Sequence, residues 1–426
     1  MKKVIKVALF TSLLTLTRML SGFVIAKFVA IYTGPVGLAT LGQLQSVVTL
    51  LNGVVNSPVG NGIVRYTAES LTKSENIAES CSSWWRASIC WAFILCVSIS
   101  IFIYFFNCNI SVWLFGSSSY SKFISIASYL LPFSVLYTAI NSVINGQQEY
   151  KKYVKFGIIS VLISTFIMSM MIIFFAVDGA LYAAVSQVAI MGIVMLVLVF
   201  ASREPWMRVK YWFGRIGKHE LRNIGSYVAM GLSSAIMVPI TLVVIRNILV
   251  DNVGWIETGY WQAVWRISEV YLSVITLTLS TYYLPKLSTL NAYSEIKKEI
   301  TNTAILVMPI VIILAVFVYL LRDFIIYVLF SSDFNGAGDL FLVQLVGDVV
   351  KILSWLYAFP MLSRGAAKWF VASEVFFSLT LMFFVYLLVP YYGTHGANMA
   401  YLINYIFYLA FVMSNLRRIC GKFNRA

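Results

Sequence analysis

Positively charged side chains inside apolar stretches are the first feature of this sequence that could do chemistry. The run 7–31 contains Arg18 and Lys27, yet it is long enough to cross a bilayer, for which a helix needs about 20 mostly apolar residues. An arginine or lysine at the centre of such a helix costs about 2.5 to 3.5 kcal/mol on insertion scales, so intramembrane charge is a functional-site hypothesis by default. Thr11, Thr15 and Arg18 share one stripe of the helix, and we expect this stripe to line a polar cavity.

Five basic residues fall inside predicted membrane spans rather than at their ends and form the predicted binding site for an anionic ligand: Arg18, Lys27, Arg246, Arg266 and Lys351. The planar guanidinium of arginine can hold phosphate oxygens through two parallel hydrogen bonds, whereas lysine supplies a compact charge. Two structural interpretations stay open. Arg18 could pair within the helix bundle, and Lys27 could extend toward the membrane interface.

Two acidic residues stand near these cations at helical spacing. Glu269 follows Arg266 by three residues, and Asp348 precedes Lys351 by three. Because residues three apart lie on the same helix face, each acid is predicted to form an ion pair with its neighbour. Such pairs are either structural or places where a proton or ion is exchanged.

Two tryptophans lie close to this charged region. Trp261, Trp265 and Glu269 follow one another at intervals of four residues, so they share a helix face. Aromatic rings flanked by polar groups suit the apolar faces of sugars, which makes both rings candidates for stacking on a sugar. Packing against lipid or neighbouring helices is the alternative interpretation.

The composition predicts a polytopic membrane protein. The chain has 426 residues, of which 60% are hydrophobic and 11% charged, and its mean hydropathy is +0.85. A soluble domain has about 25% charged residues. The net charge of +14 resides mostly in short loops between apolar runs, so no basic domain exists that could bind nucleic acid.

No sequence pattern predicts a catalytic, metal or cofactor site, so we expect a protein that is not an enzyme. The two histidines, His219 and His395, are far apart, and the five cysteines show no CxxC spacing. A Walker A motif is absent from the sequence, so the chain is not expected to hydrolyse ATP. The predicted outer loops are too short to carry a catalytic domain.

Twelve apolar runs are long enough to span a membrane, so the predicted fold is all-α. They fall near 7–31, 38–62, 87–107, 122–144, 154–176, 180–201, 224–250, 258–285, 300–321, 339–362, 369–390 and 395–416. An even number of spans puts both termini on the same side of the membrane.

The basic residues of the loops predict which side that is. Loops on one face hold 24 lysines and arginines, whereas the opposite loops hold only Lys122 and Arg322. Since loops rich in Lys and Arg stay in the cytoplasm, both termini are predicted to be cytoplasmic.

The two halves of the chain repeat with an offset of about 219 residues. This offset relates Lys27 to Arg246, Gln43 to Gln262 and Gly146 to Gly365. Six helices per repeat preserve orientation, so the halves are predicted to be parallel repeats around a central cavity, where transporters place their substrate. The predicted division is an N-terminal lobe 1–202, a cytoplasmic linker 203–222 and a C-terminal lobe 223–426.

Three short motifs carry a resemblance to a known family. They are the corner Gly34-Pro35-Val36-Gly37-Leu38, the following Gly42-Gln43-Leu44-Gln45, and the stretch Arg65-Tyr66-Thr67-Ala68-Glu69. With the two cations of the first helix, they resemble the O-antigen unit flippases (Wzx-type) of the multidrug/oligosaccharidyl-lipid/polysaccharide (MOP) exporter superfamily.

The resemblance implies a fold like that of the MATE transporters, with Arg18 and Lys27 at the family's paired basic positions. It implies translocation of an undecaprenyl-pyrophosphate-linked oligosaccharide from the cytoplasmic to the periplasmic leaflet of the bacterial inner membrane, by alternating access, for lipopolysaccharide biosynthesis. The implied partners are this lipid-linked oligosaccharide, membrane lipids and other proteins of surface-polysaccharide assembly.

Two other functions remain as alternatives. A MATE-like exporter of cationic drugs would need intramembrane acids, whereas the excess here is basic. A membrane glycan polymerase or ligase would need a substantial outer loop with catalytic groups, which the sequence does not predict.

Overall fold

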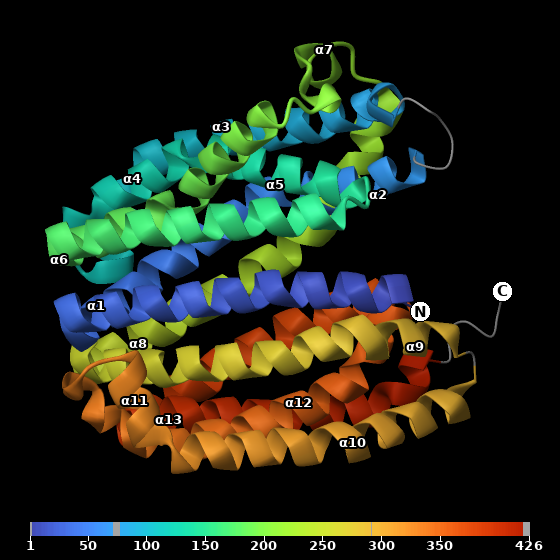
Figure 1. Ribbon diagram of the computed structural model, residues 1–426. Coiled ribbons are helices and arrows are strands. Elements are labelled where there is room, and N and C mark those ends of the chain that lie inside the picture. The colour runs from blue at the N-terminus through green and yellow to red at the C-terminus, as the bar shows by residue number, and fades with distance from the viewer. Residues whose placement is uncertain (1, 71–76, 291, 421–426) are drawn as a thin grey trace. The chain divides into compact units, whose positions relative to one another are not determined.

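The structure is a computed structural model that describes residues 2–70, 77–290 and 292–420. Every element in these ranges is a helix (Figure 1). In a bilayer no water is available to bond the backbone, so a helix, which satisfies its own N–H and C=O groups, is the natural element for such apolar runs. The all-α prediction is confirmed.

The α-helices follow one another with short connections. They are α1 (Lys2–Asn56), α2 (Gly60–Ser70), α3 (Ile77–Phe115), α4 (Ser121–Tyr129), α5 (Leu131–Gly146), α6 (Tyr150–Ala201), α7 (Val209–Trp212), α8 (Lys218–Thr278), α9 (Leu284–Thr289), α10 (Tyr293–Leu320), α11 (Arg322–Leu329), α12 (Phe341–Ser363) and α13 (Ala367–Cys420). Short 3₁₀ turns at 118–120, 205–207 and 332–340 and a π turn at 279–283 complete the described elements.

Four of the long helices are broken by a single residue with positive φ. These residues are Gly34 in α1 (φ 64°), Ala176 in α6 (46°), Gly254 in α8 (81°) and Gly393 in α13 (57°). Eight described stretches are long and apolar enough to span a membrane, and the four broken ones measure 43 to 53 residues. At about 20 residues per crossing, each broken stretch crosses twice. Dividing the four at their breaks gives the twelve predicted spans.

The breaks repeat along the chain as the sequence repeat predicts. Gly34 and Gly254 are 220 residues apart, and Ala176 and Gly393 are 217 apart. Both offsets lie within two residues of the offset that relates Lys27 to Arg246. The same backbone event therefore occurs at equivalent places in the two halves.

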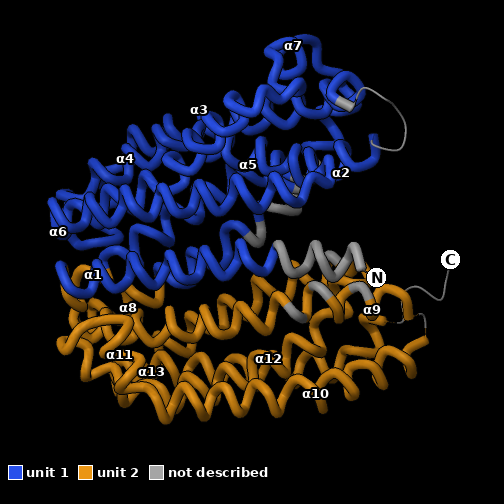
Figure 2. The backbone as a smooth tube through the Cα atoms, viewed as in Figure 1, with its two compact units in different colours: residues 1–32, 40–243 blue, residues 33–39, 244–426 orange. Residues whose placement is uncertain are grey.

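The described helices divide into two compact units (Figure 2). Unit 1 comprises residues 1–32 and 40–243, and unit 2 comprises 33–39 and 244–426. The segment 203–222, predicted as a linker, lies within unit 1. The lobe boundaries given by the sequence stay a prediction.

Each unit has its own packing. In unit 1, α5 packs against α6 and α2, and α3 packs against α4. In unit 2, α12 packs against α13 and α10 over a buried cluster that includes Tyr283, Ile300 and Leu356. Outward-facing apolar side chains such as Phe105 (71% exposed) and Leu306 (69% exposed) suit a lipid environment.

Candidate functional site

Asp348 of α12 is the centre of a buried polar cluster in unit 2. Its side chain is 0% exposed. The hydroxyl of Tyr271 donates to Oδ2 over 2.6 Å, the hydroxyl of Tyr401 donates to Oδ1 over 2.8 Å, and Nε2 of Gln344 donates to Oδ1 over 3.3 Å. A carboxylate can stay buried only when such donors replace its water. Three helices, α8, α12 and α13, therefore meet at this side chain.

Lys351, one turn further along α12, lies among aromatic rings. Its Nζ is 5.1 Å from the ring centroid of Trp355, 5.5 Å from those of Tyr401 and Tyr405, and 5.8 Å from that of Trp265. Each ring is within the roughly 6 Å over which a cation is attracted to an aromatic face. Lys351 is half-buried, so it is the more accessible member of the pair with Asp348.

The predicted ion pair between Asp348 and Lys351 is not formed as a direct contact. The ion pairs found among the described residues involve other side chains. The hydroxyls of Tyr271 and Tyr401 are hydrogen-bonded to the carboxylate of Asp348. The ammonium group of Lys351 lies instead among aromatic rings. The three-residue spacing thus places the two side chains on one helix face without a contact ion pair between them.

Arg246 lies before the break at Gly254 in α8 and contacts residues of the same helix that lie after the break. Its side chain is 2% exposed, and its Nε donates to Oε1 of Gln262 over 2.8 Å. The guanidinium carbon lies 5.9 Å from the ring centroid of Trp261. The hydrogen bond from Arg246 to Gln262 stabilises the bend of α8 at Gly254. Because Arg246 is buried, a ligand has little access to its guanidinium in this structure.

Arg266 and Glu269 are arranged differently from the prediction. Glu269 is exposed and Arg266 is half-buried, and no contact ion pair joins them in the described part of the chain. The three-residue spacing therefore does not produce a contact ion pair here.

The two candidate sugar-stacking rings differ in accessibility. Trp261 is 2% exposed, whereas Trp265 is half-buried. Their centroids are 5.2 Å apart at an interplanar angle of 32°, and Trp265 meets Tyr401 edge to face. Trp265 thus presents the more accessible ring, and sugar stacking stays a prediction.

The cations of the first helix lie in unit 1. Arg18 is exposed, and its Nη2 donates to the hydroxyl of Tyr137 over 3.1 Å. Lys27 is half-buried. The hydroxyl of Thr15 donates to the backbone carbonyl of Thr11 over 3.1 Å, so this polar group is bonded within its own helix.

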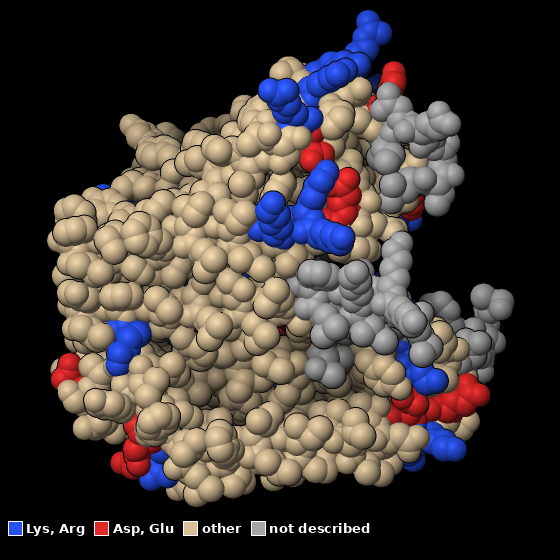
Figure 3. All heavy atoms as spheres, viewed as in Figure 1, with Lys and Arg blue, Asp and Glu red and all other residues tan. Residues whose placement is uncertain are grey.

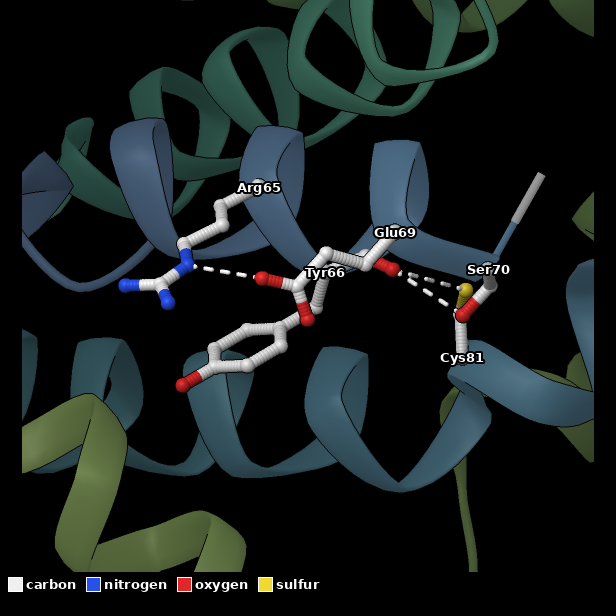
Figure 4. Close-up of polar contacts among 5 residues, drawn as sticks. All are labelled: Arg65, Tyr66, Glu69, Ser70 and Cys81. Atoms are coloured by element: carbon white, nitrogen blue, oxygen red, sulfur yellow. Dashed lines mark hydrogen bonds and ion pairs between the residues drawn. The ribbon is translucent and has the colours of Figure 1, made fainter. Parts of the chain in front are cut away.

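The stretch 65–69 of α2 has a structural role in this arrangement. Figure 4 shows Arg65 paired with Glu69, with 2.9 Å between Nε and Oε1. The carbonyl of Tyr66 accepts hydrogen bonds from Ser70 (3.0 Å) and from the thiol of Cys81 on α3 (3.6 Å). These contacts connect the end of α2 to α3.

The sequence did not identify the tyrosines of the site. Tyr271 and Tyr401 stand 77 and 53 residues from Asp348, so no local spacing signals their contact with it. Tyr137, the partner of Arg18, was missed for the same reason. Within the described ranges no group of three His, Cys, Asp or Glu side chains could hold a metal ion.

Chemically, the charged side chains on the predicted spans of unit 2 differ in accessibility. Asp348 is enclosed by donors, whereas Lys351 and Arg266 are half-buried. An approaching ligand could therefore meet Lys351, Arg266 and the exposed Glu269, but not the carboxylate of Asp348.

Comparison with known proteins agrees with this architecture. No family model matches the chain. Two curated relatives named Lipid III flippase, from Escherichia coli (strain K12) and Shigella flexneri, are each 26% identical over 408 residues, which covers 95% of this chain and 96% of each relative.

Solved structures show the same fold. An inward-facing multidrug resistance MATE family transporter of the MOP superfamily matches with a TM-score of 0.77 at 13% identity, over 95% of this chain and 96% of that one. A MOP superfamily transporter from Pyrococcus furiosus, whose binding pocket of reverse polarity suggests a different function for it, matches with a TM-score of 0.71 at 13% identity, over 99% and 96%. The chain is thus a polytopic membrane protein with the fold of the MOP superfamily transporters.

Proposed function

We propose that this protein is a flippase that moves an undecaprenyl-pyrophosphate-linked oligosaccharide, an O-antigen repeat unit, from the cytoplasmic to the periplasmic leaflet of the bacterial inner membrane. The observation that carries the proposal is the excess of cations within the spans, five basic residues against Glu269, Asp348 and Glu374, the last near the predicted cytoplasmic end of its span. The likeness to Lipid III flippases over 95% of the chain supports a lipid-linked substrate.

The cations differ in how they can serve this substrate. Arg18, Arg266 and Lys351 are exposed or half-buried and would meet the pyrophosphate, because an anion gains most from cations in a medium of low dielectric constant. Lys27, also half-buried, would add a second cation in unit 1. Arg246 is buried and bonded to Gln262, so its positive charge would attract the pyrophosphate from a distance without contacting it.

The acid and the rings complete the proposed site. Trp265, as the more accessible tryptophan, would stack on a sugar. Glu269 is the accessible acid through which a proton or ion could couple to transport. In this proposal both termini are cytoplasmic, and other proteins of surface-polysaccharide assembly supply the substrate and receive the product.

A deletion strain tests the proposal directly. Loss of the gene should abolish the surface polysaccharide and leave the lipid-linked unit accumulated on the cytoplasmic leaflet. Intact surface polysaccharide without such accumulation would overturn the proposal.

Complementation of that strain tests the cations. Lys351→Gln and Arg266→Gln should each lower export at least tenfold per molecule of membrane-inserted protein. Lys122→Gln is a matched control, since Lys122, near the start of α4 in unit 1, pairs with Asp178 of α6 at 3.6 Å. Equal export from all three variants would remove the unit 2 cations from the site.

A further inference from the structure

The segment 203–222, which runs from the end of α6 into the start of α8, is attached to α3 in unit 1 by a cluster of three tryptophans. Trp85 of α3 is fully buried and stacks on Trp212 of α7, with 5.1 Å between ring centroids. Trp206 is 3% exposed and meets Trp85 edge to face at 6.4 Å. The indole N–H of Trp212 donates to the carbonyl of Trp206 over 3.0 Å. The inner side of the segment is thus a small apolar core.

Hydrogen bonds to the backbone fix the shape of the segment. The guanidinium of Arg86, next to Trp85 on α3, donates to the carbonyls of Lys210 and Arg215. Gly214 between them has φ of 143°, and a Cβ there would lie 2.8 Å from the guanidinium carbon of Arg86. A side chain at 214 would therefore displace the arginine that holds the segment.

The outer side of the segment combines positive charge with exposed apolar groups. Six basic side chains are exposed, namely Arg203, Arg208, Lys210, Arg215, Lys218 and Arg222. Val209 and Phe213 are 70% and 72% exposed. Figure 3 shows basic side chains gathered over α7, at the top of the view.

These exposed apolar groups lie outside the candidate membrane spans. The neighbouring spans are Tyr150–Ala201 and Ala235–Leu277. Contact with the hydrocarbon core therefore does not account for Val209 and Phe213, although the segment begins directly where the span in α6 ends. The membrane surface is the environment in which a basic, partly apolar segment next to a span is stabilised.

We propose that the segment 203–222 is a preformed binding surface for the head groups of anionic phospholipids in the cytoplasmic leaflet. Its lysines and arginines bind the phosphates, and Val209 and Phe213 enter the region between head groups and acyl chains. Because the inner side is held by Trp85 and Arg86, little conformational freedom is lost on binding. The proposal depends on the membrane location of the chain and is independent of the flippase substrate.

Native mass spectrometry of the full-length protein in detergent tests this surface. The probes are phosphatidylglycerol, which is anionic, and phosphatidylcholine, which is zwitterionic. We expect preferential binding of phosphatidylglycerol to the parent protein. Each basic residue near a charged membrane surface changes affinity by about fivefold, so the triple variant Arg208→Gln, Lys210→Gln, Arg215→Gln should lose on the order of 100-fold.

The triple variant should retain its fold, since Arg86 contacts the backbone rather than the side chains of Lys210 and Arg215. The matched control is Lys297→Gln, Lys298→Gln, Arg418→Gln, which removes three exposed charges from unit 2. Loss of phosphatidylglycerol binding in the first variant and its retention in the control would support the proposal. Equal binding of both lipids by the parent, or equal losses in the two triple variants, would overturn it.

Discussion

Tyr401 contacts both charged residues of α12: its hydroxyl donates to Oδ1 of Asp348 over 2.8 Å, and its ring centroid lies 5.5 Å from Nζ of Lys351. One side chain from α13 thus satisfies the acid through its hydroxyl and attracts the base through its ring. The hydroxyl of Tyr401 bonds Asp348 while its ring faces Lys351, so Asp348 is hydrogen-bonded and Lys351 stays accessible.

Replacing Tyr401 by Phe should lower the stability of the protein. The substitution keeps the ring near Lys351 and removes one donor from a buried carboxylate, and hydrogen bonds to charged groups contribute about 1.5 to 3 kcal/mol. Thermal unfolding in detergent would measure the loss. Tyr405→Phe is the control, because its ring also lies 5.5 Å from Lys351 while the hydrogen bonds to Asp348 come from other residues. Equal unfolding temperatures for the two variants would contradict the role of the hydroxyl.

The two intramembrane acids should respond differently to neutralisation. Asp348→Asn should reduce the amount of folded protein, because an amide N–H₂ would face donors that now point at a carboxylate oxygen. Glu269→Gln should leave the folded amount unchanged, since Glu269 is exposed, and should reduce transport if the acid couples an ion. Western blots of membranes, combined with export assays, separate the two effects. Normal export from Glu269→Gln would exclude it from coupling.

Arg18→Ala should change transport without changing the amount of folded protein. Arg18 is exposed, and its hydrogen bond to Tyr137 joins two groups that water can also satisfy. We expect normalised export to fall at least tenfold, with partial recovery in Arg18→Lys if charge alone matters. Tyr137→Phe is the control for the hydrogen bond. Unchanged export by Arg18→Ala would remove the residue from the substrate path.

Gln262→Leu should destabilise the corner of α8 by about 1 to 3 kcal/mol, because it removes the acceptor of Nε in the buried Arg246. The double variant Arg246→Met, Gln262→Leu should unfold at a higher temperature than Gln262→Leu alone, since it removes the polar group that the single variant leaves without this acceptor. Unfolding temperatures of the two single variants and the double variant measure the coupling. Additive losses would show that the two residues act independently.

Ala176→Gly should stabilise the protein by about 1 kcal/mol. Ala176 has φ of 46°, a backbone region that is strained for a residue with a Cβ, whereas its counterpart in the second half is Gly393. The reciprocal change Gly393→Ala should lower stability, also because a Cβ there would meet Val253 at 3.3 Å. Thermal unfolding of both variants checks the expected opposite signs. Shifts of the same sign would contradict the strain.

The spans were predictable because length and apolar composition determine them. The breaks at Gly34, Ala176, Gly254 and Gly393 fall between or at the edges of predicted spans, where the hydrophobic runs end. The repeat was visible for a similar reason, since equivalent corners need residues that tolerate positive φ and mostly use glycine.

The contacts within the site were less predictable. The three-residue spacing placed Asp348 and Lys351 on one face, but a buried carboxylate takes the shortest available donors, and these came from Tyr271 and Tyr401 on other helices. The attachment of 203–222 was also missed, because Trp85 and Trp212 are far apart in sequence. Spacing along one helix cannot show which distant ring or hydroxyl packs against it.

The one-residue breaks also bear on how the chain enters the membrane during synthesis. At Ala176 the span before the break connects to the span after it with no loop between them. A translocon that releases spans into the lipid singly would have to hold the first arm until the second is made. The two arms of α6 should therefore be inserted together as a helical hairpin, and an epitope inserted beside Ala176 should block insertion of both.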